Sequence, residues 1–195
     1  YPRNLYAAFI STLDDRIGAL LKKLDELGIK DNTIIVFQSD NGHSTEQRAH
    51  FGGGNAGPYR GAKSSLFEGG IRVPAAITWP SKIQKGAIRN QFGVNSDWMP
   101  TLAELCGIKL DSQDLDGKSL VSIIHNEKEK TRHTEGYCWQ YQDMWVARKG
   151  NWKLLGNPRD TSKKIYKLKE KRFLVNLDDD IGESTNLFKK YPEKV

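Results

Sequence analysis

The chain has 195 residues, of which 37% are hydrophobic and 28% charged, and its net charge is +6. This composition is that of a globular protein with room for one sizeable core, and no run of about 20 apolar residues predicts a membrane span. Its two cysteines are too few for a disulfide framework and lack the spacing of a zinc finger.

The segment from Tyr6 to Leu27 has the pattern of an amphipathic helix. Its apolar residues recur at helical spacing, with charged residues between them. Gly28 is placed to end this helix in a left-handed cap. The continuous apolar run Thr33–Phe37 then predicts a strand that is buried on both faces, as in a parallel sheet covered by helices. A helix followed by such a strand favours an α/β architecture.

The middle of the chain continues this alternation. Val73–Trp79 predicts a second strand, which Pro80 ends. Trp98–Leu105 predicts a short helix closed by Gly107, and Leu120–Ile124 predicts one further helical turn.

The last third of the sequence differs in character. Two strand-like runs, Trp145–Arg148 and Trp152–Leu155, flank a glycine turn, which is typical of a β-hairpin. Phe173–Leu177 predicts a third strand. We therefore expect an α/β unit over residues 1–125 and a small antiparallel α+β unit over residues 126–195.

The excess of positive charge also lies in this last part. From Arg148 onward, 13 Lys and Arg oppose 7 Asp and Glu, an excess equal to the whole net charge. Such a tail can attract polyanions, whether nucleic acid or sulfated glycan. A solvated lysine-rich surface is the commoner meaning of such a run, and the aromatic-basic alternation typical of nucleic-acid platforms is missing. We therefore expect no nucleic-acid partner.

The end of the first predicted strand carries the residues of most interest. Asp40 and Asn41 follow it directly, and ligands in open α/β sheets bind beyond the carboxyl ends of the strands. A carboxylate beside an amide offers two adjacent oxygen ligands to a hard cation such as Ca²⁺. Asp-Asn-Gly is also among the commonest turn sequences, so a plain turn is the alternative.

A longer pattern surrounds this turn. After the S-D-N-G run and a glycine-rich loop, the motif R-G-x-K-x-x-x-x-E-G-G-x-R-V-P extends from Arg60 to Pro74. Together these motifs resemble the sulfatase family over nearly the whole chain, and the block from Glu68 to Pro74 is the most specific. Weaker motifs of the same family follow in order at Trp79–Pro80, Asp97–Leu102, Asp116–Leu120, Arg148–Leu154 and Asn176–Leu187.

The resemblance implies the core fold of alkaline phosphatase, a mixed sheet flanked by helices, with the small antiparallel sheet appended. It also implies one divalent cation, usually Ca²⁺, and hydrolysis of sulfate esters of aryl or carbohydrate compounds by an exported protein. Asp40 and Asn41 match the family's second pair of metal ligands, and Lys63 matches the lysine that contacts the sulfate near the leaving oxygen. A lysine suits that place because its compact charge neutralises negative charge on the ester oxygen as the S–O bond breaks.

Three more candidates lie in the loop after the metal pair. His43, Glu46 and His50 are candidate substrate contacts, and His43 is also a candidate catalytic residue, since imidazole can hydrogen-bond or donate a proton near neutral pH. A solvent-exposed histidine is the alternative, because this loop varies within the family. We interpret Glu68 and the two arginines of the long motif as structural partners of the Gly-Gly turn.

The nucleophile of the family is not found in the sequence. Sulfatases use a formylglycine made from the first residue of a C/S-x-P-x-R motif, and neither Cys106 nor Cys138 begins one. Ser44 has Arg48 at the right spacing, but Glu46 stands where proline is required. The family's first Asp-Asp metal pair is missing too. We therefore expect the C-terminal portion of a sulfatase, with the formylglycine upstream in a missing N-terminal part, and no activity of the chain alone.

Two alternatives to a sulfatase stay open. A phosphodiesterase or phosphonate hydrolase of the same superfamily would share much of the scaffold and differ in its upstream nucleophile and number of metals. A non-catalytic module would use the basic tail to bind sulfated polysaccharide, with salt-dependent retention on heparin. The sulfatase interpretation depends on one geometric expectation, that Lys63 and the pair Asp40–Asn41 converge on a common pocket.

Overall fold

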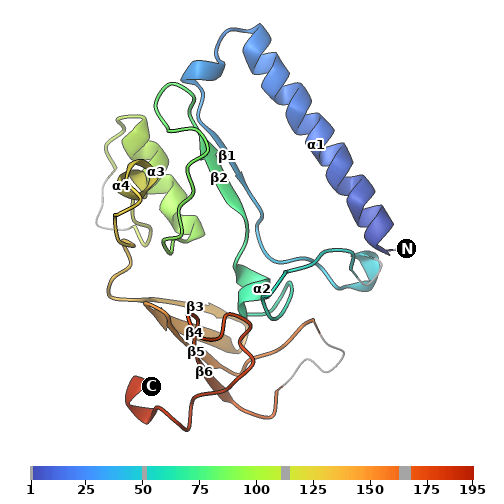
Figure 1. The fold of residues 1–195 in the computed structure, drawn as a ribbon, viewed down its shortest axis with the longest axis vertical. Coiled ribbons are helices and arrows are strands. Elements are labelled where there is room, and N and C mark those ends of the chain that lie inside the picture. The colour runs from blue at the N-terminus through green and yellow to red at the C-terminus, as the bar shows by residue number, and fades with distance from the viewer. Residues whose placement is uncertain (1, 50–51, 111–114, 163–167) are drawn as a thin grey trace.

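A long helix, a two-stranded sheet and a four-stranded sheet follow one another along the chain (Figure 1). The structure, a computed structural model, describes residues 2–49, 52–110, 115–162 and 168–195. Short 3-10 turns cover Lys30–Asn32, Gln47–Ala49, Asn95–Asp97 and Pro192–Lys194. The helices and strands are α1 (Pro2–Glu26), β1 (Ile35–Gln38), α2 (Glu68–Ile71), β2 (Ala75–Thr78), α3 (Trp98–Leu105), α4 (Val121–His125), β3 (Tyr137–Tyr141), β4 (Met144–Lys149), β5 (Trp152–Gly156) and β6 (Arg172–Asn176).

The helix α1 lies along one side of the molecule (Figure 1). None of its described residues is buried, and Phe9 on its apolar stripe is 75% exposed. Gly28 has a φ of 66° just after the helix, as a left-handed cap requires. The predicted helix and its glycine end are therefore confirmed, although the described residues leave the apolar stripe open.

The strands β1 and β2 form an antiparallel pair, with Ile35 opposite Thr78 and Gln38 opposite Ala75. The expectation of a strand buried on both faces was wrong for the described residues, since no residue of β1 is buried and Phe37 is 50% exposed. Branched and aromatic residues favour a strand in either setting. The apolar run therefore predicted the strand correctly but did not determine what covers it.

The start of α3 is fixed by a buried carboxylate. Asp97 is 0% exposed and accepts hydrogen bonds from the N–H groups of Val94 and Lys118, each at 2.8 Å. His133 Nε2 lies 2.9 Å from Asp97 Oδ1. These contacts join the start of α3 to the segment that leads into the four-stranded sheet. Gly107, with a φ of 70°, follows the end of α3 as predicted.

The four-stranded sheet is antiparallel, in the order β3-β4-β5-β6. The predicted hairpin is confirmed, because Lys149 pairs with Trp152 across a turn at Gly150, whose φ is 58°. The third predicted strand corresponds to β6. The strand β3, which was not expected from the sequence, forms one edge of the sheet.

The main hydrophobic core lies against this sheet and includes residues from the first part of the chain. The wholly buried ring of Phe67 meets the ring of Phe173 edge-on, with 5.4 Å between centroids. The division at residue 125 stays a prediction, and the core contains residues from both sides of it. Its buried members are Leu66, Phe67, Met144, Val146, Leu155, Phe173, Val175 and Leu177.

We expect Leu155→Ala to lower the free energy of unfolding by about 2–5 kcal/mol, because it removes a buried side chain from this core. Leu154→Ala is the matched control, since successive side chains of a strand point to opposite faces and Leu154 is partly exposed. Urea denaturation of both variants measures the difference. Equal losses would contradict the assignment of the inner face of β5.

Candidate functional site

The turn after β1 is held in place by its backbone. The Ser39 N–H donates to the Pro74 carbonyl at 3.3 Å, and the Gly42 N–H donates to the Gly70 carbonyl at 2.9 Å. Ser39 Oγ also donates to the Asn41 carbonyl at 2.9 Å, which closes the turn. The residues that the sequence predicts as metal ligands thus lie on a turn fixed at both ends.

Asp40 and Asn41 lie side by side on this turn. Asp40 is exposed and Asn41 partly buried, and Asn41 Nδ2 donates to Asp40 Oδ2 at 2.6 Å. Their carboxylate and amide oxygens suit a hard cation, which takes roughly six to eight oxygen ligands. Within the described ranges no group of three or more His, Cys, Asp or Glu could hold a metal ion. The pair therefore fits part of a coordination shell.

The backbone of the turn after β1 packs directly against the backbone of Gly69 and Gly70. A Cβ atom at Gly42 would stand 2.0 Å from the carbonyl oxygen of Gly69, and one at Gly70 would stand 2.2 Å from the carbonyl oxygen of Ser65. Backbone atoms cannot move aside as the end of a flexible side chain can. Glycine is therefore required at positions 42 and 70, because the neighbouring backbone leaves no room for a Cβ atom.

The structure brings the backbone of Lys63 beside this turn. Its N–H donates to the carbonyl of His43 at 3.0 Å, and His43 follows Asp40 by three positions. The Lys63 side chain is partly exposed, next to the fully buried Ala62. The two loops of the predicted site are therefore neighbours in the fold, and the convergence of their side chains stays a prediction.

The remaining candidates are distributed along the loop after the turn. His43 is partly buried and packs closely on Gly54, where an added Cβ would stand 2.4 Å from the His43 Cβ. Burial lowers the pKa of His43 below its ordinary value, which favours the neutral imidazole. Glu46 is exposed and accepts a hydrogen bond from Ser44 Oγ at 3.2 Å. His50 lies outside the described residues.

A cluster of buried charges lies next to the Gly-Gly turn, and only one of its members, Glu68, was expected from the sequence to be a structural charge. It consists of Glu68 on α2, Lys153 on β5 and Glu183, each no more than 2% exposed, and we call it the buried charge cluster. Lys153 Nζ donates to Glu68 Oε1 at 2.8 Å and lies 2.9 Å from Glu183 Oε1. Glu183 Oε2 accepts the backbone N–H of Glu68 at 2.5 Å. One ammonium group thus serves two carboxylates.

The two carboxylates of the cluster differ in their titration. Burial raises the pKa of Glu183 to about 7, because desolvation outweighs the attraction of Lys153. Burial also opposes ionisation of Glu68, but Lys153, Arg148 and Arg72 together outweigh it and lower the pKa of that group. Near neutral pH, Glu68 is therefore ionised while Glu183 is close to its midpoint.

The segment between β5 and β6 fastens the loop that carries Lys63. Ser65 Oγ donates to the Arg159 carbonyl at 2.7 Å, and Thr161 Oγ1 donates to the Ala62 carbonyl at 2.9 Å. The loop is therefore held from the side of the four-stranded sheet as well as by the turn after β1.

A hollow of about 1430 Å³ lies beside β1 and β2. Its lining includes Asp40 from the turn, together with Arg72 and Arg148. Both arginines face Glu68 Oε2, at 3.6 Å and 3.9 Å from their NH1 atoms. This hollow therefore borders the exposed carboxylate of the turn on one part of its wall and the buried charge cluster on another.

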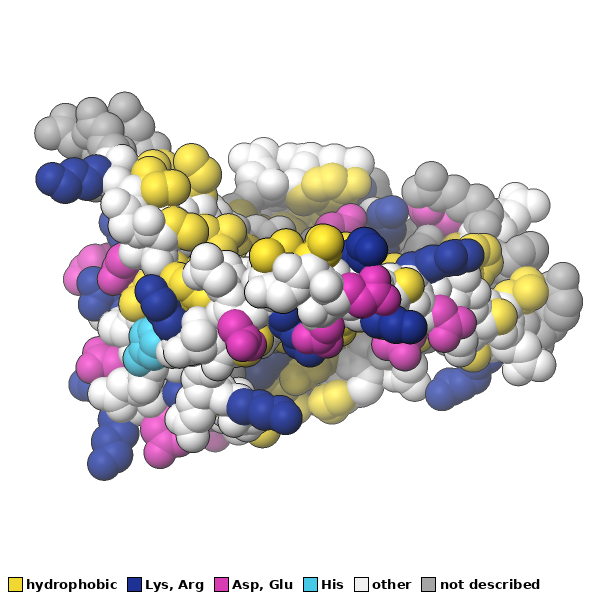
Figure 2. Space-filling view, turned by 90° about the horizontal axis from the view of Figure 1, so that it is seen from above, with side chains coloured by type: hydrophobic (Ala, Val, Ile, Leu, Met, Phe, Trp, Pro, Cys, Tyr) yellow, Lys and Arg dark blue, Asp and Glu magenta, His cyan; other side chains and the backbone are white. Residues whose placement is uncertain are grey.

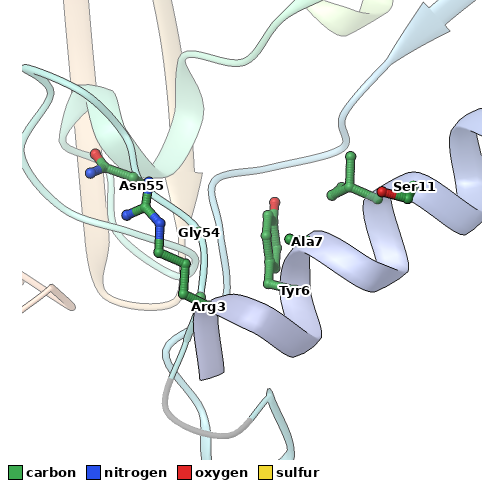
Figure 3. A pocket seen from close by; sticks show the side chains of 8 residues that line it. Arg3, Tyr6, Ala7, Ser11, Gly54 and Asn55 are labelled. Atoms are coloured by element: carbon green, nitrogen blue, oxygen red, sulfur yellow. The ribbon is translucent and has the colours of Figure 1, made fainter. Parts of the chain in front are cut away.

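A smaller hollow of about 370 Å³ lies between the start of α1 and the loop Gly53–Asn55 (Figure 3). There the side chain of Arg3 extends toward Asn55, and the ring of Tyr6 stands beside it. None of the predicted site residues in the described ranges lines it. It is therefore separate from the turn that carries Asp40.

Charges of both signs are interspersed on the face shown in Figure 2, with hydrophobic side chains exposed between them. Neither sign gathers into one patch on that face. In the part of the chain that the structure describes, no helix is both long and apolar enough to cross a bilayer.

Two family models match the chain. The model described as sulfatase matches residues 1–108, and the model described as N-sulphoglucosamine sulphohydrolase, C-terminal, matches residues 60–194. The two matches overlap over the loop that carries Lys63 and the Gly-Gly turn.

Several curated proteins are similar to the chain. A sulfatase of Formosa agariphila is 31% identical over 97% of this chain and 36% of its own length. Arylsulfatase A of Bos taurus is 30% identical over 98% of this chain and 40% of its own length. N-acetylgalactosamine-6-sulfatase of Mus musculus is 38% identical over 63% of this chain and 24% of its own length. The chain thus spans less than half the length of these relatives.

Solved structures share the fold. Ps i-CgsB in complex with k-i-k-neocarrahexaose superposes with a TM-score of 0.80 and 28% identity, over 98% of this chain and 40% of that one. A phosphonate monoester hydrolase of Agrobacterium radiobacter superposes with a TM-score of 0.68 over 98% of this chain and 38% of that one. Its identity is 22%, so this second likeness shows the fold alone. The α/β fold expected from the sequence, with its appended antiparallel sheet, is confirmed by these neighbours.

The raised pKa of Glu183 predicts a specific pH dependence of stability. The folded protein holds this proton more tightly than the unfolded chain, where the usual value is 4.5. The stability that protonated Glu183 contributes is therefore fully present below that value and is lost as the pH rises through about 7. We expect Glu183→Gln, which cannot ionise, to gain stability relative to the wild type as the pH rises from 5 to 8. Urea denaturation across this range measures the gain, and a difference that does not vary with pH would contradict it.

Proposed function

The chain belongs to the sulfatase family, and on that basis we propose that it forms the portion of a sulfuric ester hydrolase that supplies two metal ligands and the sulfate-contacting lysine. In this proposal Asp40 and Asn41 bind a divalent cation and Lys63 binds the sulfate group. The nucleophile and the other metal ligands come from a part of the enzyme that precedes these residues, so the chain alone does not turn over substrate.

One observation supports this assignment more than any other. The N–H of Lys63 donates to the carbonyl of His43 at 3.0 Å, so the loop with the lysine and the turn with the Asp40–Asn41 pair are neighbours although 22 positions separate Lys63 from Asn41. Both loops lie within the residues that the sulfatase model matches. A cation site and an anion-binding lysine in adjoining loops are what a sulfate ester requires, because its charge must be balanced while a bond to sulfur breaks.

The residues of this chain have separate parts in the proposed reaction. A divalent cation, for which we propose Ca²⁺, would supply positive charge that balances the negative charge of the sulfate ester. Asp40 and Asn41 hold that cation, and oxygen ligands of this kind suit a hard ion. Lys63 neutralises negative charge on the leaving ester oxygen as its bond to sulfur breaks. His43 lies beside Lys63 through its backbone and contacts the leaving group, with Glu46 and His50 as further substrate contacts.

We favour a sulfated carbohydrate as the substrate class. Two of the similar proteins support this choice: one is named as an N-acetylgalactosamine-6-sulfatase, and another was crystallised with k-i-k-neocarrahexaose. Aryl sulfates remain the second class, in line with the relative named arylsulfatase A. We further propose that the protein is exported, as the family resemblance implies.

The two other candidate functions have less support. The relatives with the stronger sequence similarity are named as sulfatases, whereas the phosphonate monoester hydrolase shares the fold at 22% identity. A non-catalytic module that binds polyanions through the basic tail would have no need of the Gly42 contact with Gly69, which brings the two loops of the site together.

We expect Lys63→Ala in the complete enzyme to lower kcat/KM by roughly 100- to 1000-fold, because the charge on the leaving oxygen is no longer neutralised. Lys82→Ala, which removes an exposed lysine that stacks on Trp79, is the matched control and should keep wild-type turnover. Sulfate release from a sulfated sugar measures turnover, and urea denaturation measures folding. Unchanged turnover in the Lys63 variant would refute its role.

We expect a chelator to abolish turnover of the complete enzyme and Ca²⁺ to restore it. Asp40→Ala should need at least about tenfold more Ca²⁺ for half-maximal recovery, because affinity depends on the number and charge of the oxygen ligands. Asp15→Ala on the exposed face of α1 is the matched control. The Ca²⁺ titration of activity compares the three proteins. Identical midpoints for the wild type and the Asp40 variant would exclude Asp40 from the metal shell.

A further inference from the structure

The buried charge cluster connects the four-stranded sheet to the candidate site. In Figure 1, α2 lies directly next to that sheet. Lys153 is 0% exposed on β5, and its Nζ holds the side chain of Glu68, while Glu183 Oε2 holds the backbone N–H of the same residue. Glu68 is thus fixed at both its side chain and its main chain by residues that follow it by 85 and 115 positions.

From Glu68 the contacts continue directly into the site. The next two residues are Gly69 and Gly70, and the Gly70 carbonyl accepts the N–H of Gly42 on the metal-ligand turn at 2.9 Å. The Gly69 N–H donates to the carbonyl of Arg60 at 2.6 Å, at the start of the loop that carries Lys63. A displacement of Glu68 would therefore shift Gly69 and Gly70, which hydrogen-bond to the loop with Lys63 and to the turn with Asp40 respectively.

The free-energy cost of burying charges indicates that the buried charge cluster does more than stabilise the fold. Removing charged groups from water is costly, and replacing a buried ion pair by apolar residues of similar volume is often neutral or stabilising. Here a single ammonium, that of Lys153, faces two carboxylates, and the raised pKa of Glu183 reflects a desolvation that Lys153 does not fully offset. Unlike an apolar contact, the charge-assisted hydrogen bonds of this cluster are directional and fix the position of the Glu68 atoms.

We propose that Lys153, together with Glu183, is a positioning residue for the sulfatase reaction, which acts through Glu68 and the Gly-Gly turn to set the separation between Lys63 and the metal-ligand turn. This inference rests on the proposed function for the role of Lys63. The chain of contacts from Lys153 through Glu68 to the two loops does not depend on that function. The four-stranded sheet is accordingly part of the support of the active site.

The test uses Lys153→Met in the complete enzyme, with Lys149→Met as the matched control. Lys149 lies on the neighbouring strand with 71% of its side chain exposed, 4.0 Å from Glu135. Amide hydrogen exchange reports the hold on the loops, and steady-state kinetics report turnover. We expect Lys153→Met to speed exchange of the Lys63 and Gly42 amides by at least about tenfold and to lower kcat on the order of 100-fold. The control should change neither.

A second variant separates positioning from stability. Lys153→Met/Glu183→Gln removes the ammonium and one of its two carboxylates, so its melting temperature should return part of the way to that of the wild type. Positioning predicts that exchange at Lys63 stays fast and kcat stays low in this variant, because the ammonium that holds Glu68 is still missing. Recovery of kcat together with the melting temperature would overturn the proposal, as would wild-type exchange and turnover in Lys153→Met.

The two proposals fail in different ways. A wild-type enzyme that hydrolyses no sulfate ester would refute the proposed function, and the exchange measurements would still decide whether Lys153 holds the loops. An active wild type whose Lys63 and Gly42 amides exchange at the same rate in all variants would refute the positioning role alone.

Discussion

Two loops can approach each other closely in this protein because Gly42, Gly69 and Gly70 carry no side chains. The turn after β1 touches the Gly69–Gly70 pair from one side, where a Cβ at Gly42 would stand 2.0 Å from the Gly69 oxygen. The loop with Lys63 touches it from the other, where a Cβ at Gly70 would stand 2.2 Å from the Ser65 oxygen. Any larger residue at these points would force the loops apart, and the proposed metal ligands and the proposed sulfate-binding lysine would then be separated. The proposed chemistry therefore depends first on a steric constraint and only then on charge.

The buried charge cluster is unusual because its three charged side chains are almost completely shielded from solvent. Lys153 is wholly enclosed, and the two carboxylates that it serves are no more than 2% exposed. Glu68 gains further attraction from Arg148 and Arg72, which lie at the edge of the large hollow, so its charge is compensated from several directions. At Glu183 the desolvation by burial outweighs the attraction of Lys153, and its pKa is raised to about 7. The cluster thus combines one firmly ionised member with one that can exchange its proton near neutral pH.

Sequence patterns predicted the local elements well and the long-range contacts poorly. The helical repeat before Gly28, the hairpin around Gly150 and the turn at Asp40 each depend on neighbours within a few positions, and local chemistry is sufficient for these. Lys153 was interpreted as part of a strand and of a weak family motif, without a partner, because a lone lysine in an apolar run gives no sign of its partners. One signal was present: Lys153 and the core residue Leu155 are two positions apart and hence on the same face of a strand. A lysine on the inner face of a strand requires a buried counter-charge, although the sequence does not say which one.

The shared core has a consequence for how this family can vary. Phe67, one position before Glu68, is enclosed by side chains of the four-stranded sheet, and Ser65 is hydrogen-bonded to the segment between β5 and β6. The sheet is therefore not an interchangeable attachment. A chimera that takes its sheet from one relative and its Gly-Gly loop from another would have to preserve both the Phe67–Phe173 contact and the Lys153–Glu68 salt bridge. This architecture favours inheritance of the four-stranded sheet and the Gly-Gly loop as a unit. Exposed hairpin turns such as the one at Gly150 are freer to diverge.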